Sequence, residues 1–118
     1  MIKGIGLDII EIQRIKKAIH KNDRFIDRIL TINERNIYKR FSSENRKLEF
    51  LAGRFAAKEA FAKASQQGIG KLSFQHIEIL SSDNGAPKMI VEGYEQEQIF
   101  LSITHSKQYA AAQVIITS

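Results

Sequence analysis

The sequence contains no cysteine and no tryptophan, and its 118 residues include one proline. The absence of cysteine excludes disulfide bonds and thiolate metal sites, so a reducing cytoplasm is the expected compartment. Hydrophobic runs are short. The apolar stretch at the N-terminus is interrupted by Asp8 and Glu11, and no run approaches the roughly 20 apolar residues of a membrane span. We therefore expect a soluble protein without an export signal or a membrane contact.

A chain of this length buries about two-thirds of its unfolded surface, so residues 1–118 are expected to form a single domain. The net charge of +5 is concentrated in residues 13–40, which hold nine lysine and arginine residues against three acidic ones. This basic segment favours an acidic partner, which could be a nucleic acid, an anionic lipid or an acidic protein. The alternative is a solvated helix face without a partner.

The hydrophobic pattern predicts an α+β domain, with helices mainly in the first half packed on a mainly antiparallel sheet. Residues 2–12 are apolar on both faces, which indicates a largely buried strand. Thr31 and Glu34 form a capping-box pattern, and Ser42 or Ser43 is expected to cap a long helix. The expected helices are 12–20, 25–30, 31–41 and 44–66, and the further strands are 74–80, 88–92, 99–104 and 109–117.

Two carboxylates occupy apolar surroundings. Asp8 lies on the first strand, on the face flanked by Gly4 and Gly6, and glycine in a strand often marks a close approach of other backbone. Glu59 lies near the middle of an apolar stripe on a helix that should be covered on both sides. A buried carboxylate needs a compensating partner. The simplest partner is Lys63, four residues on, which would make Glu59 part of an ordinary helix ion pair.

If Asp8 and Glu59 converge, they either share a proton or bind a divalent cation. Mg²⁺ suits this chain better than zinc, because it takes one or two carboxylates and completes its shell with water and phosphate oxygens. Possible phosphate donors are the cations of Arg54, Lys58 and Lys63 and the turn Gly68-Ile69-Gly70-Lys71. The GIGLD and GIGK stretches match neither a dinucleotide fingerprint nor a P-loop.

Four motifs, taken together, carry a resemblance to a known family. They are GIGLDIIEIQRI, FLAGRFAAKEAFAKA, the Gly85-Ala86-Pro87 turn and SITHSKQYAAAQVI, and they span almost the whole chain. In this order they resemble the holo-acyl-carrier-protein synthases, the short bacterial 4′-phosphopantetheinyl transferases. Thr104 stands where many members have serine, which affects at most a minor hydroxyl contact.

The resemblance implies transfer of 4′-phosphopantetheine from coenzyme A to a serine of apo-acyl-carrier protein for fatty acid biosynthesis, leaving adenosine 3′,5′-bisphosphate. It implies Mg²⁺, with Mn²⁺ as a substitute, and a homotrimer with active sites at the subunit interfaces. Asp8 and Glu59 match the metal ligands, and Lys63 matches a lysine near the pyrophosphate. The proton acceptor is either a metal-bound water or Glu59. The residues expected to contact coenzyme A are Arg54, Lys63, Gly68, Gly70, Pro87, His105 and Ser106.

The resemblance also gives the basic segment an acidic acyl carrier protein as its partner, docked on the first helix and the following turn. The expected contacts are Arg14, Lys17, Lys21, Arg24 and Arg28, with Phe25 as an apolar anchor. The main alternative is a nucleic-acid-binding module without catalytic activity. It is disfavoured because few aromatic residues are interleaved with the cations, so no nucleic-acid partner is expected. A third alternative is a purely structural subunit.

Overall fold

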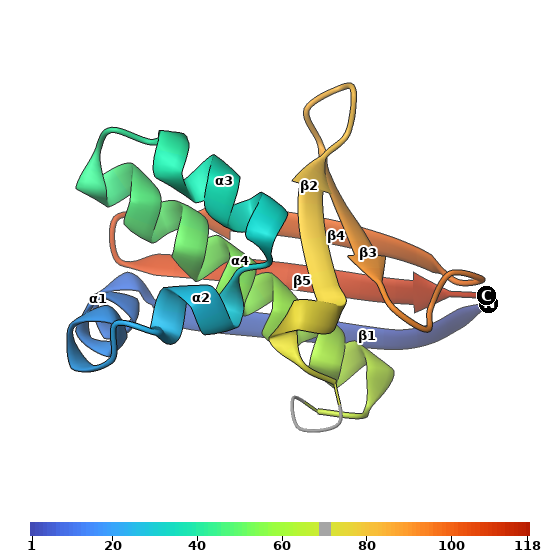
Figure 1. Cartoon of the computed structure of the whole chain (residues 1–118). Helices are drawn as coiled ribbons and strands as arrows, with labels where there is room; N and C mark the ends of the chain where they lie inside the picture. Colours follow the sequence, from blue (N-terminus) through green and yellow to red (C-terminus); the bar gives the residue numbers. More distant parts are fainter. Residues whose placement is uncertain (69–71) are drawn as a thin grey trace.

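The computed structural model describes residues 1–68 and 72–118. The chain forms an α+β fold in which strand β1 is followed by four helices and then by the other strands (Figure 1). The helices and strands are β1 (Ile2–Glu11), α1 (Ile12–Lys21), α2 (Phe25–Ile29), α3 (Ile32–Arg40), α4 (Glu44–Ser65), the 3₁₀ helix η1 (Phe74–His76), β2 (Ile77–Ser81), β3 (Pro87–Val91), β4 (Gln98–His105) and β5 (Tyr109–Thr117).

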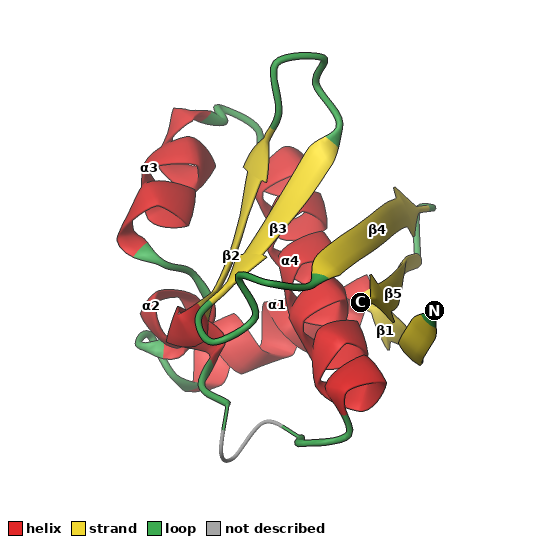
Figure 2. Cartoon of the chain, turned by 90° about the vertical axis from the view of Figure 1, so that its right-hand side faces the viewer, coloured by secondary structure: helices red, strands yellow, loops and turns green. Residues whose placement is uncertain are grey.

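The strands form two antiparallel sheets, one of three strands in the order β1-β5-β4 and one hairpin of β2 and β3. Helix α4 lies between these sheets and is covered on its other sides by α1, α2 and α3 (Figure 2). Ten of its residues are buried, among them Leu51, Ala56 and Phe61. The prediction of a helix covered on both faces is therefore confirmed. None of the described helices is both long and apolar enough to cross a bilayer.

Local capping signals place the helix starts where the sequence predicts them. The Thr31 side chain accepts a hydrogen bond from the Glu34 backbone, and the Glu34 carboxylate accepts one from Thr31, so α3 begins with a capping box. Ser43 caps α4 by accepting a hydrogen bond from the backbone N–H of Arg46 at 3.3 Å. The predicted strand 74–80 is wrong at its start. Ser73 caps a 3₁₀ turn over residues 74–76, and the strand begins only at Ile77.

Two glycines bring β1 unusually close to α4. A side-chain carbon added at Gly4 would overlap the carbonyl group of Ala64, and one added at Gly6 would overlap that of Ala60. The strand backbone therefore lies directly on the helix backbone, which no residue larger than glycine permits here. This contact confirms the close approach predicted from Gly4 and Gly6, and it places the following residues of β1 beside the C-terminal half of α4.

The prediction that β1 is buried on both faces is wrong for the chain on its own. Ile5, Leu7 and Ile9 are 57%, 61% and 63% exposed. They lie on the face of the three-stranded sheet opposite α4, where Phe100 of β4 is also exposed. Hydrophobic alternation shows that both faces of a strand are apolar, but it does not show that the same chain covers both of them.

Candidate functional site

Asp8, Glu59 and Lys63 meet where β1 crosses the C-terminal half of α4. Asp8 is partly buried, with 16% of its side chain exposed, and Glu59 is half-buried. The Lys63 ammonium donates to Asp8 Oδ1 at 2.9 Å and to the carbonyl oxygen of Leu7 at 3.1 Å. The simple prediction of a Glu59–Lys63 ion pair is not confirmed, because the lysine crosses to the strand instead. The convergence of these three predicted residues follows from the contact of Gly4 and Gly6 with α4, because Gly6 lies two residues before Asp8 on β1.

The electrostatics of the cluster favour a cation. Burial raises the pKa of the Glu59 carboxyl, and the negative charge of Asp8 raises it further, while Lys63 opposes both effects. Two carboxylates are therefore close enough to repel, and one lysine compensates them only in part. An additional positive charge at this point would stabilise the ionised form of both carboxylates.

The donor set fits Mg²⁺. Asp8 Oδ1 and the Leu7 carbonyl oxygen both accept hydrogen bonds from the Lys63 ammonium, so both oxygens already face one cation. Among residues 1–68 and 72–118, no group of three or more histidine, aspartate or glutamate side chains could hold a metal ion. A pair of carboxylates leaves most of an octahedral shell for water and phosphate oxygens, which is the usual arrangement for Mg²⁺.

A small cavity of about 170 Å³ lies further towards the N-terminal end of α4. Arg54 is on its wall, about 7.5 Å along the helix axis from Glu59 at a rise of about 1.5 Å per residue. The guanidinium of Arg54 stacks on the Phe50 ring at 4.2 Å and donates to the carbonyl oxygen of Ile79 at 3.4 Å. Its buried Nε atom has no hydrogen-bond partner among the described residues. Burial lowers the pKa of Arg54, with the charge of Glu34 opposing the shift.

His105 lines the same cavity, and its Nδ1 lies 3.6 Å from the carboxylate of Glu49. The structure thus brings together Arg54 and His105, two of the residues expected to contact coenzyme A. The next residue, Ser106, uses its hydroxyl oxygen to accept hydrogen bonds from the backbone N–H groups of Gln108 and Tyr109. Its hydroxyl group therefore shapes the turn between β4 and β5.

Two other predicted residues, Pro87 and Gly68, lie apart from this cavity. Pro87 is the first residue of β3, directly after the loop of the β2–β3 hairpin, which projects from the body of the molecule (Figure 1). Gly68 follows α4, is exposed and has a φ of 74°, a conformation that favours glycine. Gly70 lies outside the described residues. A single chain therefore does not bring all of the predicted coenzyme A contacts together.

Lys58 is not a phosphate donor, contrary to the expectation from its place on α4. Its side chain is fully buried and forms an ion pair with Glu34 at 2.6 Å. Burial lowers the pKa of Lys58, while the charge of Glu34 and its hydrogen bond raise it. Lys58 was predicted to be a site cation because it is next to Glu59 in the sequence, but its side chain points away from that site into the core.

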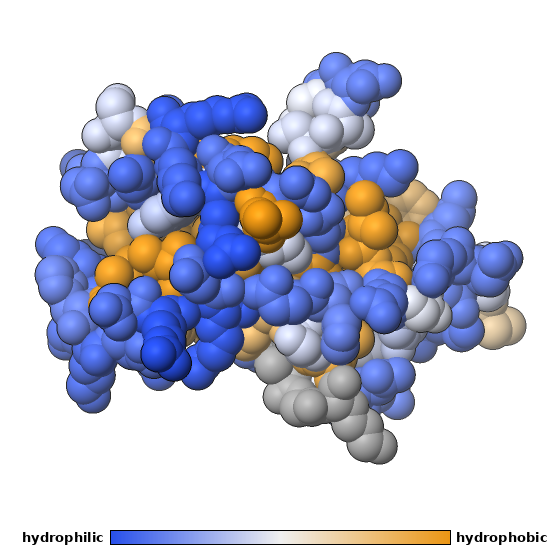
Figure 3. Space-filling model, in the orientation of Figure 1, coloured by the Kyte–Doolittle hydropathy of each residue, from blue (hydrophilic) through white to orange (hydrophobic). Residues whose placement is uncertain are grey.

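Eight of the nine cations of the basic segment are exposed, and the ninth, Arg35, is partly buried. Hydrophilic residues gather over α1 and α3 in the view of Figure 3. The five predicted docking residues are exposed: Arg14, Lys17, Lys21, Arg24 and Arg28. The assignment of Phe25 as an apolar anchor is wrong for this conformation. Phe25 is only 8% exposed, and its ring packs 6.2 Å from that of Phe55 in the core.

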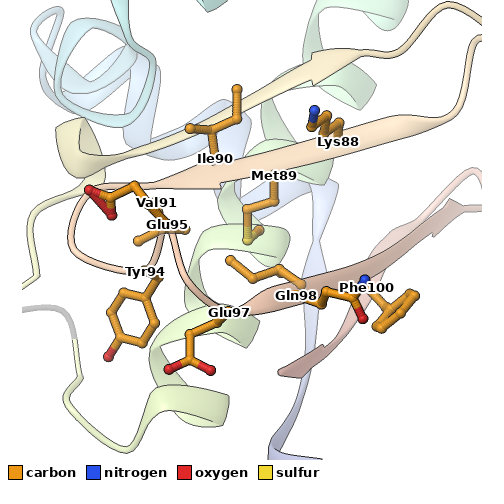
Figure 4. Close-up of a pocket in the computed structure, with 10 residues that line it drawn as sticks. Lys88, Met89, Ile90, Val91, Tyr94, Glu95, Glu97, Gln98 and Phe100 are labelled. Carbon is orange, nitrogen blue, oxygen red and sulfur yellow. The ribbon is translucent and has the colours of Figure 1, made fainter. Parts of the chain in front are cut away.

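A larger hollow of about 510 Å³ lies between β3 and β4. Figure 4 shows Met89 extending from β3 towards β4, with Tyr94 and Glu97 at one end. None of the predicted site residues lines this hollow, so its volume does not mark the cluster around Asp8. The two strands beside it are not hydrogen-bonded to each other.

Of the eight residues that line the cavity containing Arg54, sequence reasoning predicted only Arg54 and His105 as site residues, and it missed the other arginine. Arg46 and Phe41 line it together with Arg54, and the Arg46 guanidinium lies 5.4 Å from the centre of the Phe41 ring. A signal was present, because Arg46, Phe50 and Arg54 recur every four residues and so share one face of α4. The cavity therefore has two arginines on one helix face, each lying against an aromatic ring.

Comparison with known proteins gives a consistent result. The profile of the 4′-phosphopantetheinyl transferase superfamily matches residues 4–114. The holo-[acyl-carrier-protein] synthase of Oceanobacillus iheyensis is 58% identical over 116 residues, covering 98% of this chain and 97% of that protein.

Solved structures are similar over the whole fold. The holo-(acyl-carrier-protein) synthase of Bacillus anthracis in complex with CoA (3′,5′-ADP) has a TM-score of 0.91 and 50% identity, covering 100% of this chain and 98% of that one. The Helicobacter pylori synthase in complex with coenzyme A has a TM-score of 0.82 and 37% identity, covering 96% and 99%. The predicted α+β fold is thereby confirmed.

Proposed function

Because the chain belongs to the 4′-phosphopantetheinyl transferase superfamily, we propose that it is a holo-acyl-carrier-protein synthase. It transfers 4′-phosphopantetheine from coenzyme A to a serine of an apo-acyl-carrier protein for fatty acid biosynthesis. Its relatives with this name cover nearly the whole chain. The structural observation that carries the proposal is the meeting of Asp8, Glu59 and Lys63 where β1 crosses α4, with an arginine-lined cavity further along the same helix. Residues 1–118 act as one transferase domain in the cytoplasm.

In the proposed reaction the serine hydroxyl oxygen attacks the β-phosphorus of the coenzyme A diphosphate. A new bond forms between that oxygen and phosphorus, and the bond from phosphorus to the bridging oxygen breaks. Adenosine 3′,5′-bisphosphate leaves with the bond electrons, and the hydroxyl proton passes to Glu59 or to a water molecule. The Lys63 ammonium, which is 55% exposed, reaches the leaving phosphate and neutralises part of its charge.

Asp8 and Glu59 are the residues that would hold Mg²⁺, with Mn²⁺ as a possible substitute. When bound there, the ion would neutralise diphosphate charge and align the reacting groups. The support for this assignment is the pair of mutually repelling carboxylates beside a point that already receives a cation.

The arginine-lined cavity is the proposed site for the nucleotide end of coenzyme A. Arg46 and Arg54 are held by stacking on Phe41 and Phe50, so their guanidinium groups are ordered before a phosphate arrives. His105 is the third contact. Gly68, Pro87 and Ser106 remain proposed contacts, and Pro87 would act from the projecting hairpin of a neighbouring subunit.

The proposed assembly is a homotrimer with its sites at the subunit interfaces. The supporting observation is the exposed apolar face of the three-stranded sheet, which carries Ile5, Leu7, Ile9 and Phe100. Exposed apolar patches of this kind mark interfaces. Leu7 precedes Asp8 directly, so a subunit packed on this face lies beside the carboxylate cluster.

One experiment tests the proposed function directly. The protein is incubated with apo-acyl-carrier protein, coenzyme A and Mg²⁺, and the carrier is analysed by intact-mass spectrometry. The expected result is a mass gain of one phosphopantetheine arm, which is lost when the acceptor serine is replaced. An unchanged carrier mass would overturn the proposal. Tight, steeply salt-dependent RNA binding without transfer would favour the nucleic-acid alternative instead.

A further inference from the structure

Helix α2 is held by side chains from outside it. With five residues it is far shorter than a helix that is stable by itself. Gln75 Nε2 donates to the carbonyl oxygens of Asp27 at 2.8 Å, Arg28 at 3.2 Å and Leu30 at 3.0 Å. The carbonyl oxygen of Ile29, between them, accepts from Lys58 Nζ at 2.7 Å.

These contacts involve the groups that a helix end normally leaves without partners. The last carbonyls of a helix have no intrahelical donor. Four consecutive carbonyls, from Asp27 in α2 to the C-cap residue Leu30, are all bonded by only two side chains. One of these, Lys58, also brings a positive charge, which is favourable at a helix C-terminus. The position of α2 is therefore set by Lys58 of α4 and Gln75 of η1.

Lys58 is itself fixed by a buried network. Its ammonium also donates to Glu34 Oε1 at 2.6 Å and to the carbonyl oxygen of Phe74 at 3.1 Å. Glu34 in turn accepts from the backbone N–H groups of Thr31 and Ile79, each at 2.8 Å. Both charged side chains are fully buried. A buried ion pair adds little net stability over apolar residues of the same size, so its main effect here is to fix geometry.

We propose that Lys58 and Gln75 are positioning residues for the carrier protein, because they fix α2 relative to α4. Arg24 and Arg28 lie at the two ends of α2, and Lys58 directly precedes Glu59 on α4. The inference rests on the proposed function and on the predicted docking of the carrier at the first helix and the following turn, while residues of α4 act on its serine. A displacement of α2 would move its arginines relative to α4, so the carrier would bind less tightly in the orientation that presents its serine to the site.

The first test replaces Gln75 by alanine, a change at an exposed position. The expected result is a severalfold rise in KM for apo-acyl-carrier protein with KM for coenzyme A unchanged. The matched control is Gln67→Ala, which also removes one exposed glutamine whose Nε2 donates a hydrogen bond, here to the Tyr94 hydroxyl at 2.8 Å. An unchanged carrier KM in Gln75→Ala, or an equal rise in the control, would overturn the inference.

The second test removes both buried charges together, in Glu34→Gln/Lys58→Met, so that neither ion is left unpaired. Hydrogen exchange of the amides in residues 25–30 is measured beside the kinetics. Faster exchange there with a raised carrier KM is expected. A folded double variant with the carrier KM of the original protein would contradict the proposal. If the double variant does not fold, the carrier KM of Gln75→Ala alone tests the proposal.

The failure of this inference differs from the failure of the proposed function. If the original protein transfers no phosphopantetheine, the proposed function fails. If charge reversal of Arg14 and Arg24 raises the carrier KM but Gln75→Ala does not, only the positioning role fails.

Discussion

At the scale of single residues, Glu59 and Lys63 lie one helical turn apart, and the charges of both act with that of Asp8. The lysine occupies an oxygen of Asp8 that a divalent ion would also use, while Glu59 stays half-buried without an ion pair among the described residues. The cluster therefore has two negative charges and one positive charge in a small volume. Single substitutions at these residues should therefore alter both the affinity for a metal ion and the stability of the fold.

Glu59→Gln is expected to abolish transfer while raising the stability of the metal-free protein at neutral pH. Because burial and Asp8 raise the pKa of Glu59, the folded chain binds this proton more tightly than the unfolded chain. Stability contributed by this group is therefore lost as pH rises from about 4, the unfolded value, through the raised folded value. Thermal unfolding is measured between pH 3 and 8. The variant should be more stable than the original protein only at pH values above the raised folded pKa of Glu59. Near-normal transfer with saturating Mg²⁺ would contradict the ligand role.

Lys63→Gln is expected to tighten binding of Mn²⁺ by roughly tenfold, because the ammonium no longer competes for Asp8 Oδ1. Electron paramagnetic resonance of free Mn²⁺ measures this affinity without any substrate. The matched control is Lys47→Gln, which removes a lysine of the same helix that lies 4.0 Å from Glu44. Equal affinities in the two variants would show that Lys63 does not occupy the ion's position.

At the scale of secondary structure, the cations predicted to dock the carrier lie on α1, on α2 and between these helices, and their effect should be on recognition. Arg14→Glu/Arg24→Glu is expected to raise the KM for carrier protein by roughly tenfold or more and to leave that for coenzyme A unchanged. Both arginines are exposed, so the fold should tolerate the change. Steady-state kinetics at two salt concentrations measure the effect. A matching rise in both KM values would argue against docking on these helices.

The contact between β1 and α4 gives a separate prediction about stability. Gly6→Ala should cost about 2 kcal/mol or more, because its new carbon would overlap the backbone carbonyl of Ala60. Gly53→Ala is the control within α4. Its added carbon would lie 3.1 Å from Ile103 Cγ2, the end of a side chain that can move, and alanine is the better helix former. Urea unfolding of the two variants should differ clearly; similar free energies would contradict the close-contact account.

Most elements follow from local signals, and the exceptions have physical reasons. The capping box at Thr31 and the cap at Ser43 act within a few residues, so the sequence predicts the starts of α3 and α4. Phe74 alternates with its neighbours like a strand residue, but the cap at Ser73 stabilises a 3₁₀ turn.

In the candidate site, Asp8 and Glu59 were predictable from their apolar surroundings. The pairing of Lys58 with Glu34 was not, because it joins residues 24 positions apart in the core.

At the scale of the whole molecule, the exposed apolar face of the three-stranded sheet is the proposed interface between subunits. Leu7 is 61% exposed between two further exposed isoleucines on β1. The sequence showed that this face is apolar, and the resemblance supplied the expectation of a trimer. Neither periodicity nor composition says which molecule covers the face.

Leu7→Lys is expected to give a folded monomer with little transfer activity, because a charge at the centre of the apolar face cannot be buried without a partner ion. Sedimentation equilibrium measures the mass, and circular dichroism checks the fold. Ile32→Lys is the control, since Ile32 is 65% exposed but lies on α3. A variant that keeps the mass of a trimer would contradict the proposed interface.

The backbone contact at Gly4 and Gly6 has a consequence for how this enzyme can be altered. The distance between β1 and α4 is set by backbone atoms of both elements. Backbone atoms have the same size whichever side chains fill the core. Mutations that enlarge or shrink hydrophobic side chains should therefore leave the spacing of Asp8 and Glu59 nearly constant. Laboratory evolution towards a different ion radius would have to work through the lengths of the carboxylate side chains themselves.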